Sequence, residues 1–241
     1  DKELSSGEYE VFCMVHNETS TGVVSDLEPI AAVMKKYPDV LFFVDVVSSL
    51  AGMKVEVDKL GIDICLASSQ KALALPAGIA VASISSRAYK KAESVSGKGY
   101  YFDILQLKKM YAKDQTTYTP SIPHLYALKK QLERISAEGL ENRFNRHKEM
   151  ADYVRTWAVD RGFSMFPEEG CYSNTVSCIV NTKKLDFKAI KKDMATKGYS
   201  MDSGYRKLNE KLDAEGKFNT FRIAHMGDIT LDELKEFTSE L

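Results

Sequence analysis

Three stretches of polar residues follow short apolar runs, and they hold the groups best suited to chemistry. Residues 16–22, after the run 9–15, carry hydroxyl side chains; Asp45 follows the run 40–44, and Lys71 comes shortly after the run 62–67. In open parallel sheets, ligands bind outside the carboxyl ends of the strands. We therefore expect these hydroxyls, this carboxylate and this amine to lie together at one edge of a sheet.

Asp45 and Lys71 each allow two interpretations when taken alone. Burying the Asp45 carboxylate beside an apolar run is unfavourable without a cationic or hydrogen-donating partner, but a turn cap is an equally good interpretation. Lys71 also fits a surface lysine whose stem lies along apolar residues. Held out of water, its amine would have a lowered pKa and could act as a nucleophile.

Acid, amine and hydroxyls on neighbouring strand ends together match the needs of pyridoxal phosphate. A lysine amine forms a Schiff base with this cofactor, a carboxylate keeps the pyridine nitrogen protonated, and hydroxyl donors bind the phenolic oxygen and the phosphate. The residue pattern therefore favours a pyridoxal phosphate site with Lys71 and Asp45 at its centre.

Alternating strands and helices must position these residues. The apolar runs are of strand length and rich in Val, Ile and Phe, which is typical of strands buried on both faces. A helix is expected over 25–37, with a capping residue at its start and Pro38 after its end. The alternation predicts an α/β fold with a three-layer, mostly parallel sheet. The predicted strands are 9–15, 40–44, 62–67 and 78–84.

A second, smaller α/β domain is expected after residue 140, so that residues 1–140 belong to a large domain and 141–241 to a small one. Residues 207–217 are highly charged and are interpreted as a surface turn. The later elements predicted from apolar spacing are helices over 102–112, 122–137, 140–161, 186–197 and 231–241, and strands over 175–180 and 220–224.

Composition limits the partners and the location. With 33 Lys and Arg against 34 Asp and Glu, the chain has no overall basic field for nucleic acid or an anionic membrane. No apolar run could span a bilayer, and the first residues are unlike a signal peptide, so a cytoplasmic protein is expected. Four scattered cysteines and four scattered histidines predict small buried cysteines and no structural metal.

Six stretches, in order along nearly the whole chain, resemble the class V aminotransferases. This fold-type I group of pyridoxal phosphate enzymes contains the alanine–glyoxylate and serine–pyruvate aminotransferases. The matching stretches are HNETSTG at 16–22, VDVVSSLAG at 44–52, GIDICLASSQKAL at 61–73, TYTPSIPHLYAL at 117–128, EGLENRFNRHKEMA at 138–151 and FRIAHMG at 221–227.

The resemblance implies a role for each residue of the expected site. Lys71 would be the Schiff-base lysine, Asp45 the partner of the pyridine nitrogen, and Arg222 the arginine that binds the substrate α-carboxylate. Within one subunit, the other cofactor contacts would be Thr19 near the phenolic oxygen, Val47 on one ring face and Gln70 near the phosphate. Tyr118 with Thr119 or Ser121 would reach the phosphate of a neighbouring subunit's cofactor, which implies a homodimer with shared sites.

The activity implied is transfer of an amino group from alanine or serine to glyoxylate or pyruvate. A lyase of the cysteine desulfurase type is an alternative, although Gln70 stands where such enzymes usually carry a histidine and Cys171 alone could lie on a mobile loop. A non-catalytic scaffold subunit is a third interpretation. His225 and Tyr205 could reach the mouth of the substrate pocket, but a surface position is expected for each.

The chain departs from the family pattern at its start. Family members carry a long segment before the strand that leads into HNETSTG, whereas here that strand is expected from residue 9. In the family, that segment supplies a glycine-rich phosphate loop and an aromatic residue that stacks on the ring. We therefore expect residues 1–140 to be the C-terminal part of the large domain, with exposed sheet edges and a missing or separate N-terminal half.

Overall fold

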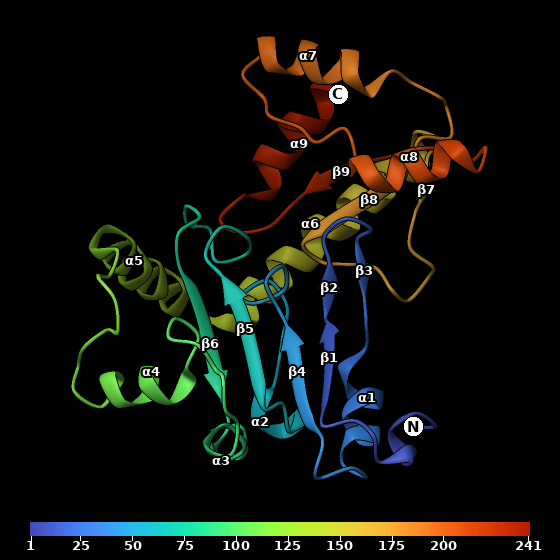
Figure 1. Ribbon diagram of the computed structural model, residues 1–241. Coiled ribbons are helices and arrows are strands. Elements are labelled where there is room, and N and C mark those ends of the chain that lie inside the picture. Colours follow the sequence, from blue (N-terminus) through green and yellow to red (C-terminus); the bar gives the residue numbers. More distant parts are fainter.

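The computed structural model describes residues 1–241 and shows strands and helices alternating through the first part of the chain (Figure 1). A short 3₁₀ turn at Leu4–Ser6 precedes the first strand. The strands of this part are β1 (Val11–Val15), β2 (Asn17–Glu18), β3 (Val23–Val24), β4 (Leu41–Asp45), β5 (Ile64–Ser68) and β6 (Ala80–Ile84). Its helices are α1 (Leu27–Met34), α2 (Val57–Leu60), α3 (Ser86–Glu93) and α4 (Ile104–Tyr111).

The main sheet has the strand order β1-β4-β5-β6, in which β1, β4 and β5 run parallel and β6 runs antiparallel. This confirms the α/β class with a mostly parallel sheet. Asp45 pairs with Val15 on one side and with Leu66 on the other. Because the three strands share a direction, their carboxyl ends meet at one edge, which faces the second sheet (Figure 1).

Helix α1 begins two residues after the predicted start, with the predicted cap, and ends three residues before the predicted end. The Asp26 side chain accepts a hydrogen bond from the Glu28 amide and so caps the first turn. The apolar stripe of α1 includes Leu27 and Ala31, which pack with Phe42 of β4 in the first hydrophobic core. Burial of a leucine of this kind stabilises the fold by about 1.5–3 kcal/mol.

The prediction that the strands are buried on both faces is wrong. On the sheet face that carries Phe42 and Val44, these two side chains are fully buried. On the opposite face, Val11, Val15 and Leu66 are 39%, 42% and 38% exposed. The helices that join these strands therefore cover one face of the sheet, and Asp45 lies on the other, half-open face, in register with Val15 and Leu66.

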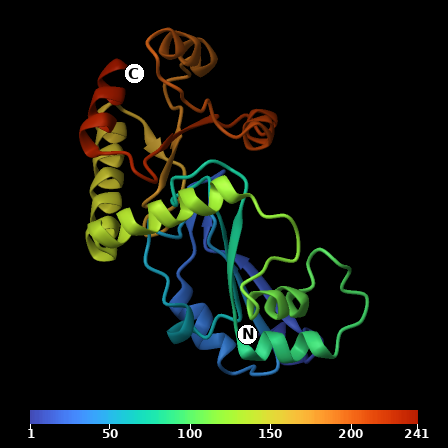
Figure 2. The same ribbon diagram turned by 90° about the vertical axis from the view of Figure 1, so that its left-hand side faces the viewer.

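The rest of the chain builds a second layer around a small antiparallel sheet. Two long helices, α5 (Ile122–Glu138) and α6 (Leu140–Asp160), meet at a sharp bend at Gly139 (Figure 2). The strands β7 (Ser164–Met165), β8 (Val176–Val180) and β9 (Thr220–Ala224) have the order β7-β8-β9. Helices α7 (Phe187–Thr196), α8 (Arg206–Ala214) and α9 (Leu231–Glu240) complete this part.

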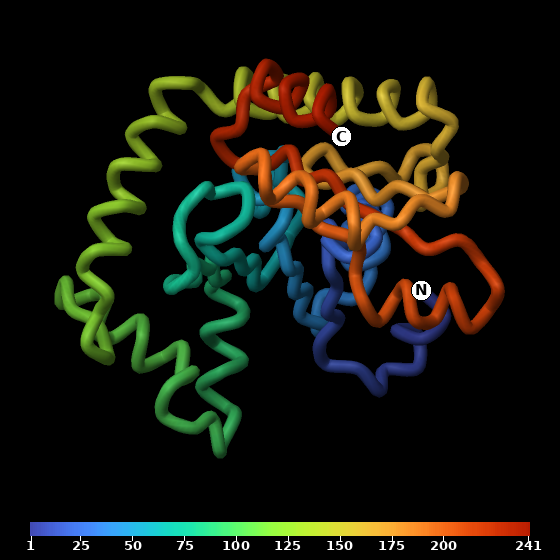
Figure 3. Tube along the Cα trace, turned by 90° about the horizontal axis from the view of Figure 1, so that it is seen from above, coloured from blue at the N-terminus to red at the C-terminus, as the bar shows by residue number.

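A second hydrophobic core joins α6 to this small sheet. Met150 and Val154 of α6 pack with Ile179 of β8 and Phe221 of β9, and all four are fully buried. Viewed from above, α9 lies next to α6, on the same side of the small sheet (Figure 3). The first core lies within residues 4–67 and the second within 150–234. Division into domains at residue 140 stays a prediction.

The charged stretch 207–217 is mainly helix α8, so its interpretation as a surface turn is wrong. Leu208 and Leu212 stand one helical turn apart, and Leu212 is buried. Two apolar positions at this spacing suffice to attach a short helix whose other face is charged. None of the helices in the chain is long and apolar enough to cross a membrane.

Candidate active site

The carboxyl edge of the main sheet joins Asp45 to Arg222 through an unbroken series of contacts. Asp45 Oδ1 accepts a hydrogen bond of 2.8 Å from the Val47 amide. Next to Val47, the Ser48 hydroxyl is hydrogen bonded to the Thr19 hydroxyl. The Thr19 carbonyl in turn accepts a bond of 2.8 Å from Arg222 Nη1. The structure thus brings four of the predicted residues together: Thr19, Asp45, Val47 and Arg222.

Lys71 stands at the same edge, in the turn that follows β5. Its carbonyl accepts a hydrogen bond of 2.8 Å from the Ala74 amide, and Ala74 has a left-handed φ of 58°. The side chain is half-buried, and its amine makes no hydrogen bond or ion pair within the chain. The neighbouring Gln70 is exposed. A tight turn therefore places the Lys71 amine, which has no hydrogen-bond partner, close to the end of β5.

A buried arginine to which no role was predicted holds this turn in place. Arg143 of α6 is only 1% exposed. It donates hydrogen bonds to the Ala51 carbonyl at 2.9 Å, the Ala72 carbonyl at 3.0 Å and the Gly227 carbonyl at 3.2 Å. These carbonyls belong to the loops after β4, β5 and β9. One side chain therefore fixes three loops of the candidate site at once.

Two carboxylates balance the charge of Arg143. Its Nη1 lies 2.8 Å from Glu138, and its Nη2 lies 3.1 Å from Asp228. Burial would raise the pKa of Glu138, but the hydrogen bonds from Arg146 and Arg143 outweigh burial and lower it. The buried guanidinium is thus paired and hydrogen bonded, which offsets the cost of removing its charge from water.

Asn17 links the main sheet to the small sheet. Its buried Nδ2 lies 3.2 Å from the Ser48 carbonyl and 2.9 Å and 2.8 Å from the hydroxyls of Ser173 and Thr175. Thr175 also donates a bond of 2.7 Å to the Ser48 carbonyl. Asn17 Oδ1 is buried without a partner. The loop that carries Val47 and Ser48 is therefore tied directly to the start of β8.

Arg222 is positioned by β9 and paired with an acid that the sequence analysis did not single out. Its side chain is 15% exposed, and its Nη2 lies 2.7 Å from Asp202 Oδ2. Burial would raise the pKa of Asp202, but hydrogen bonds from Arg222 and from the Gly204 amide more than compensate and lower it. Arg222 thus points toward the carboxyl edge, as expected, rather than to open solvent.

Three histidines are buried around the site and carry lowered pKa values. His225 was expected at the surface but is fully buried, where its ring contacts the Ser177 hydroxyl at 2.9 Å and the Asn174 carbonyl at 3.1 Å. Burial lowers the pKa of His225 to about 3. It also lowers the pKa values of His16 and His147 to about 4. All three are therefore neutral at pH 7.

The remaining predicted residues lie elsewhere within the chain. Tyr118 donates a hydrogen bond of 2.6 Å to the Tyr100 carbonyl and stacks on Tyr101 at 4.2 Å. Thr119 and Ser121 are exposed, and the Ser121 hydroxyl contacts the His124 ring. None of these side chains reaches Asp45 or Lys71 in the same chain.

The prediction of buried cysteines holds for two of the four. Burial raises the pKa of both Cys65 and Cys178 to about 11. Cys13 is exposed and Cys171 is half-buried. No group of three His, Cys, Asp or Glu side chains is placed to hold a metal ion.

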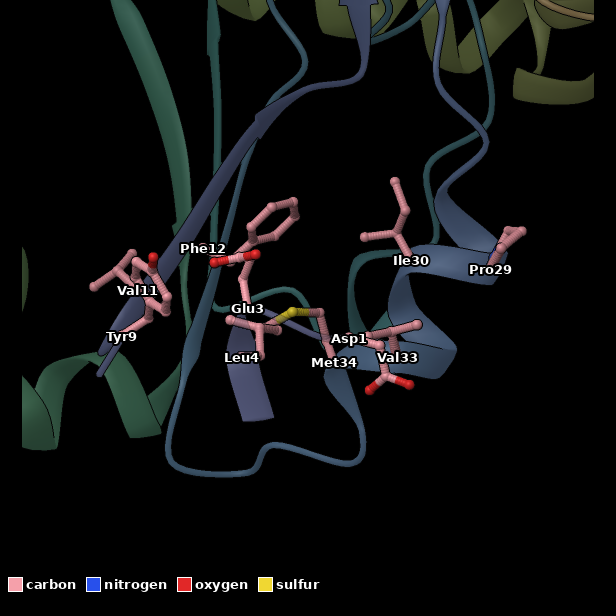
Figure 4. Close-up of a pocket in the computed structure, with 10 residues that line it drawn as sticks. All are labelled: Asp1, Glu3, Leu4, Tyr9, Val11, Phe12, Pro29, Ile30, Val33 and Met34. Carbon is pink, nitrogen blue, oxygen red and sulfur yellow. The ribbon is translucent and has the colours of Figure 1, made fainter. Parts of the chain in front are cut away.

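An apolar pocket of about 540 Å³ lies apart from these residues. It opens between the start of β1 and helix α1, beside the first residues of the chain (Figure 4). Phe12, Ile30, Val33 and Met34 supply much of its apolar lining, with Asp1 among its polar residues. This is the end of β1 opposite to the carboxyl edge, so the pocket is not part of the candidate site.

Comparison with known proteins places the chain in a family. The model of the family "Aminotransferase class-V" matches residues 2–236. The chain belongs to the class V aminotransferase family. It is 39% identical over 89% of its length to an uncharacterized aminotransferase of Methanocaldococcus jannaschii. It is 35% identical over 92% of its length to an L-aspartate–glyoxylate aminotransferase of Paracoccus denitrificans.

Solved structures of the family have the same fold. The chain superposes over its whole length on an alanine–glyoxylate aminotransferase of Nostoc sp., with a TM-score of 0.86 and 26% identity. It covers 62% of that chain, and 54% and 55% of the Methanocaldococcus and Paracoccus proteins. The chain therefore spans little more than half the length of the curated relatives that it matches. Membership of the family and the fold-type I architecture are thus shown.

The residues at the carboxyl edge fit the cofactor that class V aminotransferases use, pyridoxal phosphate. The Lys71 amine has no partner and suits the aldehyde of the cofactor. The Asp45 carboxylate, at a parallel strand end, suits the pyridine nitrogen. The Thr19 and Ser48 hydroxyls suit the phenolic oxygen. Asp45 retains Oδ2 for a further bond, because its one hydrogen bond within the chain uses Oδ1.

Proposed function

We propose that this chain provides the lysine-bearing site of a pyridoxal phosphate-dependent aminotransferase. The observation that carries the proposal is the contact series from Asp45 to Arg222, at the same sheet edge as the free amine of Lys71. The amino donor is a small amino acid such as alanine or serine, and the acceptor is glyoxylate or pyruvate. Relatives named as serine–glyoxylate aminotransferases, 31–33% identical, support this substrate class.

Each residue has a distinct task in the proposed reaction. The cofactor, when bound, supplies an aldehyde for the amine and an electron-withdrawing ring that stabilises negative charge at the substrate α-carbon. Lys71 would hold the cofactor through its amine, and the same amine, when free, would take up the proton that leaves the substrate α-carbon. Asp45 keeps a proton on the ring nitrogen. Arg222 binds the α-carboxylate and so orients the bond that breaks.

We further propose that two copies share their sites through the segment around α4. Tyr100, Tyr101 and Phe102 are 60–80% exposed, and the Tyr101 ring contacts the Phe102 ring, which makes an aromatic patch larger than isolated surface residues. Tyr118 belongs to the same patch through its stacking on Tyr101. If a second copy packed against this patch, Tyr118 and Thr119 or Ser121 of the first copy would approach the cofactor phosphate bound by the second copy. Gln70 of the second copy would contact the same phosphate.

The substrate class can be tested by assaying glycine formation from glyoxylate with a panel of amino donors. We expect the protein that contains this chain to use alanine or serine in the presence of pyridoxal phosphate. Lys71→Ala should abolish turnover and the visible absorption of the bound cofactor, and the control Lys54→Ala, which removes an exposed lysine, should change neither. Unchanged absorption in Lys71→Ala would remove the proposed role of Lys71.

A further inference from the structure

The Arg222 guanidinium already makes hydrogen bonds to Asp202 and Thr19 of the same chain. Arg222 Nε lies 3.3 Å from Asp202 Oδ1, and Nη2 lies 2.7 Å from Asp202 Oδ2. Asp202 therefore makes a two-pronged contact with one edge of the guanidinium. Nη1 donates to the Thr19 carbonyl at 2.8 Å. Three of the five N–H groups of Arg222 thus have a partner within the chain.

The two N–H groups that remain are one on Nη1 and one on Nη2. A carboxylate accepts two parallel bonds from neighbouring guanidinium nitrogens, so this remainder is what a substrate carboxylate needs. The Thr19 and Asp202 contacts hold the guanidinium on two sides and so fix its plane. An arginine side chain without them would sample several rotamers before binding.

Asp202 is itself held rigidly beside β9. Its backbone forms a β-bridge with Arg222, and its Oδ1 accepts a bond of 2.6 Å from the Gly204 amide. Gly204 has a left-handed φ of 99°, and a Cβ there would lie 2.0 Å from the Thr220 carbonyl oxygen, so this turn requires glycine. A carboxylate tied down in this way is suited to orienting Arg222 rather than to leaving when a substrate arrives.

We propose that Asp202 is a positioning residue that orients Arg222 for the carboxylate of the substrate. This inference rests on the proposed role of Arg222 in substrate binding and adds a determinant on the small sheet. It makes the carboxylate site a unit of three parts: a strand arginine, the acid beside it and the carbonyl of Thr19, which lies in the turn between β2 and β3.

Propionate is a suitable probe because it has a carboxylate and no amine. Its binding to the full chain can be followed through the ¹⁵N side-chain resonance of Arg222, without activity or cofactor. We expect Asp202→Ala to raise the Kd for propionate about ten-fold, which corresponds to ~1.4 kcal/mol. Asp202→Asn, which keeps one acceptor for the Gly204 amide and Nε, should give a smaller increase. The control Glu215→Ala removes an acid paired with Lys217 and should leave the Kd unchanged.

Steady-state kinetics of the loaded protein give the second measurement. Asp202→Ala should raise KM for the amino donor about ten-fold and leave kcat within two-fold, with a circular dichroism spectrum like that of the wild type. An unchanged or lower Kd and KM in Asp202→Ala would overturn the inference, because Asp202 would then be neutral or would compete with the substrate. If Arg222→Lys left propionate binding intact, the proposed role of Arg222 would fail instead.

Discussion

The Asp45 carboxylate uses one oxygen for a hydrogen bond to its own loop and leaves the other oxygen without a partner. Its role in folding and its proposed role in chemistry therefore involve different oxygens. The Val47 amide donates to Oδ1, and an asparagine at this position could accept the same bond. A neutral side chain could not hold a positive charge on a pyridine nitrogen. The two roles can therefore be separated by a single substitution.

We predict that Asp45→Asn lowers turnover by about a hundred-fold or more, because charge stabilisation of this kind contributes 10²–10³ in rate. Thermal unfolding should stay close to that of the wild type, since the bond to Val47 survives. Thr19→Ser, which retains the hydroxyl beside Ser48, is the matched control and should keep most of the activity. Full turnover by Asp45→Asn would exclude the assigned role.

The three buried histidines make stability depend on pH. Their folded-state pKa values of about 4 for His16 and His147 and about 3 for His225 lie below the ordinary value of 6.5. The unfolded chain therefore binds more protons below pH 6.5, and stability falls as pH drops from 6.5 toward 4. At pH 5 each histidine should cost roughly 1–2 kcal/mol.

Urea unfolding at pH 7.5, 6 and 5 would measure this loss. His147→Gln should flatten the pH dependence, because the Gly227 amide that donates to His147 Nε2 at 3.1 Å could donate to a glutamine oxygen that does not titrate. A free energy of unfolding that stayed constant from pH 7.5 to 5 would contradict the burial of neutral histidines.

At the scale of elements, helix α6 connects the second core to the loops of the main sheet. Arg143 and Arg146 stand one turn apart on this helix, and both contact Glu138 and the Gly227 carbonyl. Arg143 alone also reaches the Ala51 and Ala72 carbonyls. The two arginines therefore form a matched pair for testing what fixes the Lys71 turn.

Arg143→Met should destabilise the chain by about 3 kcal/mol or more, because it removes the donor for three loop carbonyls and one partner of a buried ion pair. Hydrogen exchange of the Ala74 amide should quicken in the same variant. Arg146→Met should cost about 1 kcal/mol and leave exchange at Ala74 unchanged, since Arg146 is more exposed and does not contact this turn. Equal effects of the two substitutions would argue against a specific role for Arg143.

Local pattern was enough to predict most elements but not their long-range contacts. Apolar spacing and caps place α1, α6 and β9 within a few residues of their positions, because the signals for these elements are contained in the elements themselves. The antiparallel direction of β6 depends on a connection that has no comparable signal. The same limit applies to the site. The order of strands along the chain is enough to predict that Asp45 and Lys71 lie at one sheet edge. Asp202 and Arg143 instead act through partners more than 19 residues away, which no local pattern indicates.

For the whole molecule, two surfaces expose apolar side chains that a partner could cover. They are the half-open face of the main sheet and the aromatic patch near α4. Val15 and Leu66 are exposed beside Asp45, so a cofactor at this edge would be open to water on one side. We therefore expect the 241-residue chain alone to bind pyridoxal phosphate weakly.

Sedimentation should detect self-association of the chain through the aromatic patch. Replacing Phe102, which is 80% exposed, by Asp should shift the chain toward monomer, because a charge would have to be buried at the contact. Val159→Asp changes another exposed apolar side chain, on α6, and is the control. Association that is equally strong in wild type and Phe102→Asp would place the contact elsewhere.

The central claim, that the amine of Lys71 reacts with the cofactor, is tested most directly by mapping the site of attachment. Pyridoxal phosphate is mixed with the full chain, the new C=N bond is reduced with borohydride, and the modified peptide is located by mass spectrometry. We predict one dominant modification, at Lys71, that disappears in Lys71→Ala. Labelling spread evenly over the exposed lysines, with Lys71 unmodified, would contradict the account.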